Sequence, residues 1–317
     1  MLLYTDDVSV ISENGERVLR REIGRYFELK EESIGPPKLY LDGHMRKVEL
    51  ANGAKEWAFS SPQYVQTAVK NVEEYLHTKG IKLPSKAETP IRTSYRPEID
   101  VSPELCPVDA AYYQSLIGIL RWMVELGRID ICLETSMMSS HLALPREGHL
   151  DQVYHMFAHL KKYHNSEMVF DPSDPVIDEA IFEKKDWTSS EFGHLQKEEL
   201  PANMPEPRGF GFIMSAKVDA DHDADTVTRR SRTGFLVFLN CAPIYWFSKK
   251  QNSVESSSFG SEFIAMKQCC EYLRGLWYKL RMMGIPCEGP AYIFGDNQSV
   301  LYNTSIPDST LKRKPKV

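Results

Sequence analysis

The chain has 317 residues, of which 42% are apolar and 11% aromatic, enough to form more than one hydrophobic core. Its formal net charge of −6 argues against a uniformly basic, nucleic-acid-binding surface, although short basic runs such as "TRRSRTG" occur. The six cysteines show no CxxC spacing, so the sequence indicates neither a zinc site nor a disulfide framework. We expect no secretory leader, because Asp6 and Asp7 interrupt the N-terminal apolar run, and no stretch approaches the roughly 18 uncharged apolar residues of a membrane span. We therefore expect an intracellular, multi-domain protein without a membrane partner.

The N-terminal stretch "MLLYTDDVSV" predicts a β-hairpin whose turn carries two adjacent carboxylates, Asp6 and Asp7. Strand-forming side chains flank the pair, among them Leu3 and Val8. Two adjacent carboxylates serve either the turn itself or a metal ion, and the hairpin alone does not distinguish these uses.

Residues 1–80 have the pattern of a mixed α/β segment. After the hairpin, "ENGERVLRREIGRYFELK" predicts an amphipathic helix whose apolar side chains, up to Phe27, share one side. Two strands follow around a turn at Asn52-Gly53, and then a helix that begins at Ser61-Pro62 and ends at Gly80.

Residues 81–205 predict a linker followed by helices. From about 81 to 109 the chain is rich in Pro, Ser, Thr and charge, which favours an extended connector. Beyond it, "AAYYQSLIGILRWMVEL" and "HLDQVYHMFAHLKKYHN" show helical periodicity, with a third helix between them. We expect an all-helical segment that ends at a polar, Pro-rich boundary over 195–209.

Residues 206–317 indicate a separate α/β domain. Three successive strands are followed by a helix from about 258 to 283, a fourth strand "AYIFGD" and a last helix. The order β-β-β-α-β-α predicts a mixed sheet whose first strands are antiparallel.

Three carboxylates of this segment stand where strands end and a helix begins. Asp219 ends the first strand, Glu262 lies near the start of the long helix, and Asp296 closes the fourth strand. Carboxylates in such places can meet at one sheet edge and bind divalent cations through hard oxygen ligands. Taken singly, each residue is better explained by a structural role, as a turn residue, a solvated helix position or a helix N-cap. Their joint placement favours a metal site.

The run from "KVDADHD" through "TRRSRTGFLVF", "YWFSKKQ" and "SSSFGSEF" to "FGDNQS" resembles the ribonuclease H domain of copia-type LTR retrotransposon polyproteins. The resemblance is specific because several separate motifs recur in the family's order. It implies that Asp219, Glu262 and Asp296 are catalytic metal ligands, with Mg²⁺ or Mn²⁺ as the cofactor. It also implies an RNA/DNA hybrid as the substrate, recognised through 2′-hydroxyls and duplex shape.

The same family offers a reading of the N-terminal hairpin. "YTDD", from Tyr4 to Asp7, is similar to the Tyr-x-Asp-Asp of its reverse transcriptase, with Thr5 where copia-type enzymes more often have Val. The motif is weak alone, but "RYFELKE", "KLYLDG" and "SLIGILRWMVELGRID" follow it in the family's order. The resemblance implies polymerase metal ligands at Asp6 and Asp7 and covers nearly the whole chain.

By this resemblance three units are expected: the C-terminal part of a reverse transcriptase palm over 1–80, a helical thumb and connection segment over 81–205, and a ribonuclease H-like domain over 206–317. A polymerase of this family also needs an earlier palm Asp and the fingers, so we expect no template-directed DNA synthesis. We likewise expect the ribonuclease site to lack its fourth residue. The only later carboxylate is Asp308, which we expect to lie in a loop.

The sequence therefore predicts a reverse transcriptase/ribonuclease H fragment that hydrolyses RNA in RNA/DNA hybrids with two metal ions. The alternative is a catalytically inactive, nucleic-acid-binding remnant, and a third class, a protein–protein scaffold, has no positive sign. Expected partners are a hybrid or template-primer and the rest of the polyprotein. A cytoplasmic particle and the nucleus are equally compatible locations.

Overall fold

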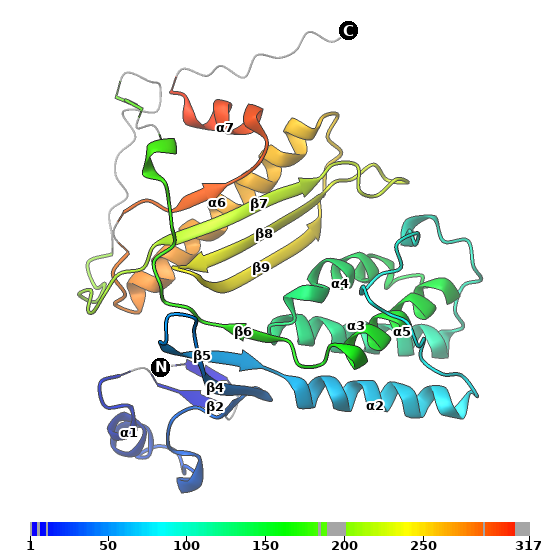
Figure 1. Cartoon of the computed structure of the whole chain (residues 1–317), viewed down its shortest axis with the longest axis horizontal. Coiled ribbons are helices and arrows are strands. Elements are labelled where there is room, and N and C mark those ends of the chain that lie inside the picture. Colours follow the sequence, from blue (N-terminus) through cyan, green and yellow to red (C-terminus); the bar gives the residue numbers. More distant parts are fainter. Residues whose placement is uncertain are drawn as a thin grey trace.

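A computed structural model describes residues 2–4, 7–10, 12–182, 185–188, 201–287 and 289–307. It contains two four-stranded sheets, a two-stranded hairpin and a group of helices beside both sheets (Figure 1). The predicted α/β class, with helices and strands mixed along the chain, is confirmed. Among the described helices, none combines the length and the apolar character that crossing a membrane requires.

The first sheet consists of antiparallel strands in chain order: β3 (Leu39–Tyr40), β4 (Gly43–Glu49), β5 (Lys55–Ser60) and β6 (Glu167–Val169). The turn predicted between β4 and β5 is present, since Gly53 has a φ of 82° and donates its N–H to the carbonyl of Leu50. Between β3 and β4, Leu41 and Asp42 both have positive φ, which matches the twist of a two-residue hairpin.

Strand β6 corrects the expectation that the chain is all-helical between the connector, which ends at about residue 109, and the boundary over 195–209. It lies against β5, with Ala58 opposite Val169, so the chain returns to the first sheet after the helices. On β4, Arg46 donates two hydrogen bonds to the carboxylate of Glu167, at 2.7 and 2.6 Å. A three-residue strand is too short to produce an alternating pattern, and it forms because β5 offers an unpaired edge.

The N-terminal hairpin is an antiparallel pair of β1 (Leu2–Tyr4) and β2 (Asp7–Ser9). Of its two acidic residues, Asp6 lies outside the described residues, and Asp7 is described only as a backbone position opposite Tyr4. The predicted metal role of this pair therefore stays a prediction.

The long N-terminal helix predicted from "ENGERVLRREIGRYFELK" is wrong beyond its first turns. The structure has α1 (Gly15–Arg17) running into a π-helical stretch over Val18–Ile23, which ends at Gly24. Phe27 lies past this end and is 63% exposed. Glycine is a poor helix former, so the apolar periodicity extends further than the helix does.

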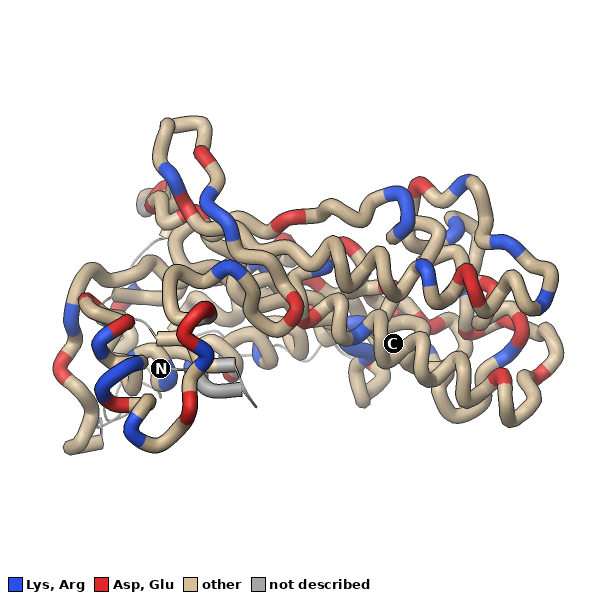
Figure 2. Tube along the Cα trace, turned by 90° about the horizontal axis from the view of Figure 1, so that it is seen from below, with Lys and Arg blue, Asp and Glu red and all other residues tan. Residues whose placement is uncertain are grey.

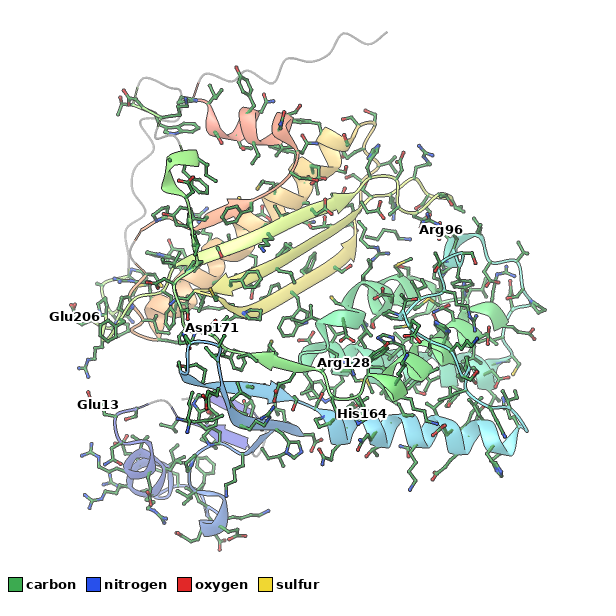
Figure 3. All side chains as sticks on the ribbon, viewed as in Figure 1. Glu13, Arg96, Arg128, His164, Asp171 and Glu206 are labelled. Atoms are coloured by element: carbon green, nitrogen blue, oxygen red, sulfur yellow. The ribbon has the colours of Figure 1, made fainter. Side chains whose placement is uncertain are left out.

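Four helices form the larger hydrophobic core: α2 (Pro62–Thr78), α3 (Pro107–Glu125), α4 (Cys132–Met138) and α5 (Glu147–Lys162). Buried side chains of α2, such as Val65, Val72 and Leu76, recur at helical spacing and pack against α3 and α5. The loop after α3 carries Arg128, labelled in Figure 3, which is 1% exposed and donates two hydrogen bonds to Asp130.

Polar side chains of α5 hold the Pro-rich connector that the sequence predicts to be extended. Gln152 and His155 hydrogen-bond the carbonyls of Pro90 and Thr89, and His149 lies 2.9 Å from the carbonyl of Pro97. These side chains provide hydrogen bonds to connector carbonyls that would bond to water if the connector were exposed. The connector is thus part of the packed helical unit.

The second sheet has the strand order β10-β7-β8-β9. Its strands are β7 (Met214–Asp221), β8 (Arg232–Leu239), β9 (Ala242–Lys250) and β10 (Tyr292–Phe294), and its helices are α6 (Ser258–Met282) and α7 (Gln298–Ser305). The first three strands pair antiparallel and β10 pairs parallel to β7, so this sheet is mixed, as predicted. Buried side chains of β7 and β8 pack against α6.

The helical unit and the second sheet meet at β9. Trp246 of β9 packs against the larger core and donates its indole N–H to the carbonyl of Val124, at 3.0 Å. Ser136 of α4 donates to the carbonyl of Ser248 and accepts a hydrogen bond from Arg232. Figure 1 shows α4 beside β9. These contacts set the orientation of the sheet relative to the helices.

Candidate metal centre

The three predicted carboxylates come from three different elements of the second sheet unit. Asp219 is the sixth residue of β7, Glu262 is the fifth residue of α6, and Asp296 follows β10 by two residues. Because β10 lies directly beside β7 and runs parallel to it, the ends of the two strands meet at one edge.

The structure brings these carboxylates together. One oxygen from each of Asp219, Glu262 and Asp296 lies within 4.8 Å of the others. Asp219 and Asp296 are exposed, whereas Glu262 is half-buried. Three carboxylates at this spacing repel one another in the absence of a cation.

The environment of Glu262 reflects this repulsion. Burial, followed by the charge of Asp219, raises the pKa of Glu262 to about 7, and the charge of Asp296 adds to the effect. The backbone N–H of Ala220 opposes the rise by hydrogen bonding to the carboxylate. A divalent cation at this point would relieve the repulsion and favour the ionised form.

The donor set fits a hard divalent cation such as Mg²⁺ or Mn²⁺. Such ions take oxygen ligands at about 2.0–2.6 Å, so ligand oxygens around one ion lie up to roughly 4–5 Å apart. The spread of 4.8 Å among the three carboxylates is of this size, and the exposure of Asp219 and Asp296 leaves room for water or substrate oxygens. The described residues place no soft ligand among the three.

A glycine permits the close approach that places Asp296. A Cβ on Gly295 would lie 3.2 Å from Cε of Met266 and 3.7 Å from Cγ1 of Val218. Directly after it, Asn297 caps α7, with its side chain accepting the N–H of Val300 at 3.1 Å. Asp296 is therefore held between a tight strand end and a capped helix.

The amino-acid sequence of the chain is similar to those of known proteins. Over 312 residues it is 22% identical to a retrovirus-related Pol polyprotein from transposon TNT 1-94 of Nicotiana tabacum. The aligned residues make up 95% of this chain and 19% of that polyprotein. Over 219 residues it is 25% identical to the retrovirus-related Pol polyprotein from transposon RE2 of Arabidopsis thaliana. The chain is similar to retrovirus-related Pol polyproteins.

These relatives are much longer than the chain. It covers 19% of the first polyprotein and 12% of the second, and 11% of a third, from transposon RE1 of Arabidopsis thaliana, to which it is 25% identical over 199 residues. No family model and no solved structure matches the chain.

A buried polar group behind the carboxylates was missed by sequence reasoning. Gln251, 2% exposed, donates from its amide to the hydroxyl of Thr233 at 3.0 Å and to the carbonyl of Ser261 at 2.9 Å. The hydroxyl of Ser261 lies 3.2 Å from Nδ1 of His222. This network joins the end of β9 to the first turn of α6, next to Glu262. The sequence shows only a Gln after two lysines, which does not distinguish a buried amide from an exposed one.

Polar residues close to the three carboxylates have structural roles. Asn297 is a helix cap, and Ser258 contributes a backbone carbonyl that accepts from the hydroxyl of Ser261. Asp221 is exposed at the end of β7. Asp308 lies outside the described residues.

Proposed function

We propose that this chain derives from a retrotransposon Pol polyprotein and that its second sheet unit hydrolyses the RNA strand of RNA/DNA hybrids with Mg²⁺ or Mn²⁺. The observation that carries the proposal is the meeting of Asp219, Glu262 and Asp296 from β7, α6 and the end of β10. The similarity to retrovirus-related Pol polyproteins supports a retroelement origin.

The chain's own residues would act by binding and orienting. Asp219 on β7 and Asp296, just past the end of β10, would hold the cations from one side, and Glu262 from the helix side. Bound divalent ions would supply activation of water and stabilisation of the leaving oxygen. The overall reaction adds water across one phosphodiester and leaves a 5′-phosphate and a 3′-hydroxyl. Glu262, whose pKa is raised to about 7, becomes fully ionised when positive charge arrives.

The test is cleavage of an RNA/DNA hybrid with labelled RNA, in Mg²⁺, in Mn²⁺ and in EDTA. Asp219→Asn and Asp296→Asn keep the side-chain shape but each remove one charge, so we expect cleavage to fall at least about a hundredfold. Glu262→Gln is expected to behave similarly. Asp221→Asn is the matched control, because Asp221 lies on the same strand and is exposed but outside the group of three.

The results separate the two main possibilities. Cleavage by the parent and by Asp221→Asn, and its loss in the three variants, supports the proposal. Equal cleavage by all proteins assigns the activity to another site or a contaminant. A parent that binds the hybrid but does not cleave it at saturating Mn²⁺ contradicts the proposal and leaves an inactive nucleic-acid-binding protein.

A further inference from the structure

A groove of about 470 Å³ lies where the helical unit meets the second sheet. Its walls are α4 and the end of α3 on one side and β9 on the other. The α4 wall presents small polar side chains at helical spacing, including Thr135 and Ser136. The groove is separate from the carboxylate group, which contributes no residue to its lining.

Two hydroxyls in this groove lack hydrogen-bonding partners. Thr135 is 3% exposed, and its hydroxyl finds no partner among the described residues. The hydroxyl of Ser248, on the facing strand, is likewise buried and unpaired within the described part of the chain. A buried hydroxyl without a partner destabilises the fold, because it has lost its hydrogen bonds to water without gaining others. Both hydroxyls, on opposite walls of one groove, therefore have hydrogen-bonding capacity that no described residue uses.

The rim of the groove carries positive charge. Arg121 and Lys249 line it, both are exposed, and neither makes an ion pair with another described residue. Glu125 also lines the groove, and a carboxylate can accept a hydrogen bond from a sugar hydroxyl. Cations, hydroxyls and one carboxylate together fit a sugar with its phosphate better than a bare anion.

The thiol in the groove does not add covalent chemistry. Burial raises the pKa of Cys132 to about 11, and the charges of Glu134 and Glu125 act in the same direction. The side chain is therefore a neutral thiol at physiological pH and a poor nucleophile. The side chains of the groove are therefore suited to binding a ligand and not to covalent chemistry with it.

The register of the second sheet links the groove to the carboxylates. Asp219 lies opposite Gly234, which lies opposite Ser248 on β9, so all three positions share one face and one row. Two strand spacings separate Asp219 from Ser248, roughly 10 Å. Gly234 lies between these two residues and has no side chain that would obstruct a bound strand. A single nucleic-acid strand can therefore reach both the carboxylates and the groove.

We infer that this groove binds one sugar-phosphate unit of a nucleic-acid strand whose neighbouring phosphodiester lies at Asp219, Glu262 and Asp296. The inference rests on the proposed function for the choice of nucleic acid as the ligand. Arg121 and Lys249 bind the phosphate, and the hydroxyls of Thr135 and Ser248 bind the sugar or a phosphate oxygen.

The experiment is a fluorescence anisotropy titration of a labelled RNA/DNA hybrid with the full chain, in EDTA and at several salt concentrations. We expect the double variant Arg121→Ala, Lys249→Ala to bind about tenfold more weakly and to lower the slope of log affinity against log salt by about two, one per cation. Thr135→Val, which is isosteric, should weaken binding about threefold without changing that slope.

Lys267→Ala is the matched control, because Lys267 is an exposed cation on α6 that does not line the groove. Thermal unfolding of each variant verifies folding. Equal affinity and equal salt slope in the parent, the double variant and Thr135→Val would overturn the inference, as would a parent that does not bind the hybrid. Because EDTA removes any metal-dependent cleavage, a parent that binds through the groove but fails to cleave in Mn²⁺ contradicts only the proposed function.

Discussion

At Gly295 a single hydrogen atom keeps the end of β10 close enough to α6 for Asp296 to meet its partners. Gly295→Ala would place a Cβ 3.2 Å from Cε of Met266 and force one of them to move. We expect Mn²⁺ affinity to fall about tenfold as Asp296 shifts, and the free energy of unfolding to fall by about 1 kcal/mol. Calorimetric Mn²⁺ titration and urea denaturation measure the two effects.

Gly275→Ala is the control for that substitution. Gly275 lies within α6, and a Cβ there meets nothing within 4 Å. Alanine at a helix interior position is better than glycine by about 0.5–1 kcal/mol, so this variant should be more stable and bind Mn²⁺ as the parent does. Unchanged Mn²⁺ binding in Gly295→Ala would show that the close approach does not position Asp296.

We expect His141 to make the stability of the helical unit depend on pH. Burial lowers its pKa to about 4, and the neighbouring His149, whose ring centroid is 4.3 Å away, acts in the same direction. The folded state therefore favours the neutral ring, while the unfolded chain takes up a proton below about pH 6.5. The stabilisation is present above about pH 6.5 and is lost as the pH falls towards 4.

Removing the titrating ring tests this dependence. In urea denaturation at pH 7, 6 and 5, His141→Gln should lose less stability on acidification than the parent does. His77→Gln, at an exposed position of α2, serves as the comparison. If both variants follow the pH dependence of the parent, burial of His141 is not its source.

At the scale of elements, Gln251 joins the end of β9 to the start of α6. Gln251→Leu removes the donor to Thr233 and to the carbonyl of Ser261, both buried. We expect the free energy of unfolding to fall by about 1–3 kcal/mol, because the abandoned acceptors stay out of water. Mn²⁺ affinity should fall as well, because the first turn of α6 carries Glu262.

Chemical denaturation and Mn²⁺ titration of Gln251→Leu are compared with Gln66→Ala, at an exposed position of α2. A surface change of this kind is worth less than about 0.5 kcal/mol. A Gln251→Leu protein as stable as the control would mean that the network contributes nothing to the placement of α6.

At the scale of the whole molecule, Trp246 couples the helical unit to the second sheet. Trp246→Ala removes its packing against the larger core and its hydrogen bond to Val124. We expect a loss of about 3 kcal/mol and faster amide hydrogen exchange on both sides of the junction, in α4 and in β9.

Trp277→Ala provides the comparison, because Trp277 packs within the second sheet unit and donates to the carbonyl of Cys287. Its loss should raise exchange in α6 and the sheet but leave α4 as in the parent. Exchange in α4 that is unchanged by Trp246→Ala would show that the two units are not coupled through this side chain. In the described part of the chain, acidic and basic residues are interspersed over both units (Figure 2), so this local contact does not compete with a broad field of one sign there.

The sequence by itself determined the elements whose patterns are long and local. Periodicity, a turn glycine and Pro at helix starts predict several elements. These are strands β4, β5 and β7 and helices α2, α3, α5 and α6. The sequence also indicated Asp219, Glu262 and Asp296, because residues at the ends of strands and at the start of a helix can meet at one edge of a sheet. Their function as metal ligands stays a prediction.

Tertiary structure decided what depends on residues far apart in the chain. The pairing of β6 with β5 across more than a hundred residues, the burial of Gln251 and the groove between α4 and β9 have no local signature. The helix predicted through Phe27 fails for the converse reason: an apolar periodicity existed, but beyond Gly24 the described residues leave Tyr26 and Phe27 exposed. Local patterns specify which face of an element is apolar, whereas only packing decides what covers that face.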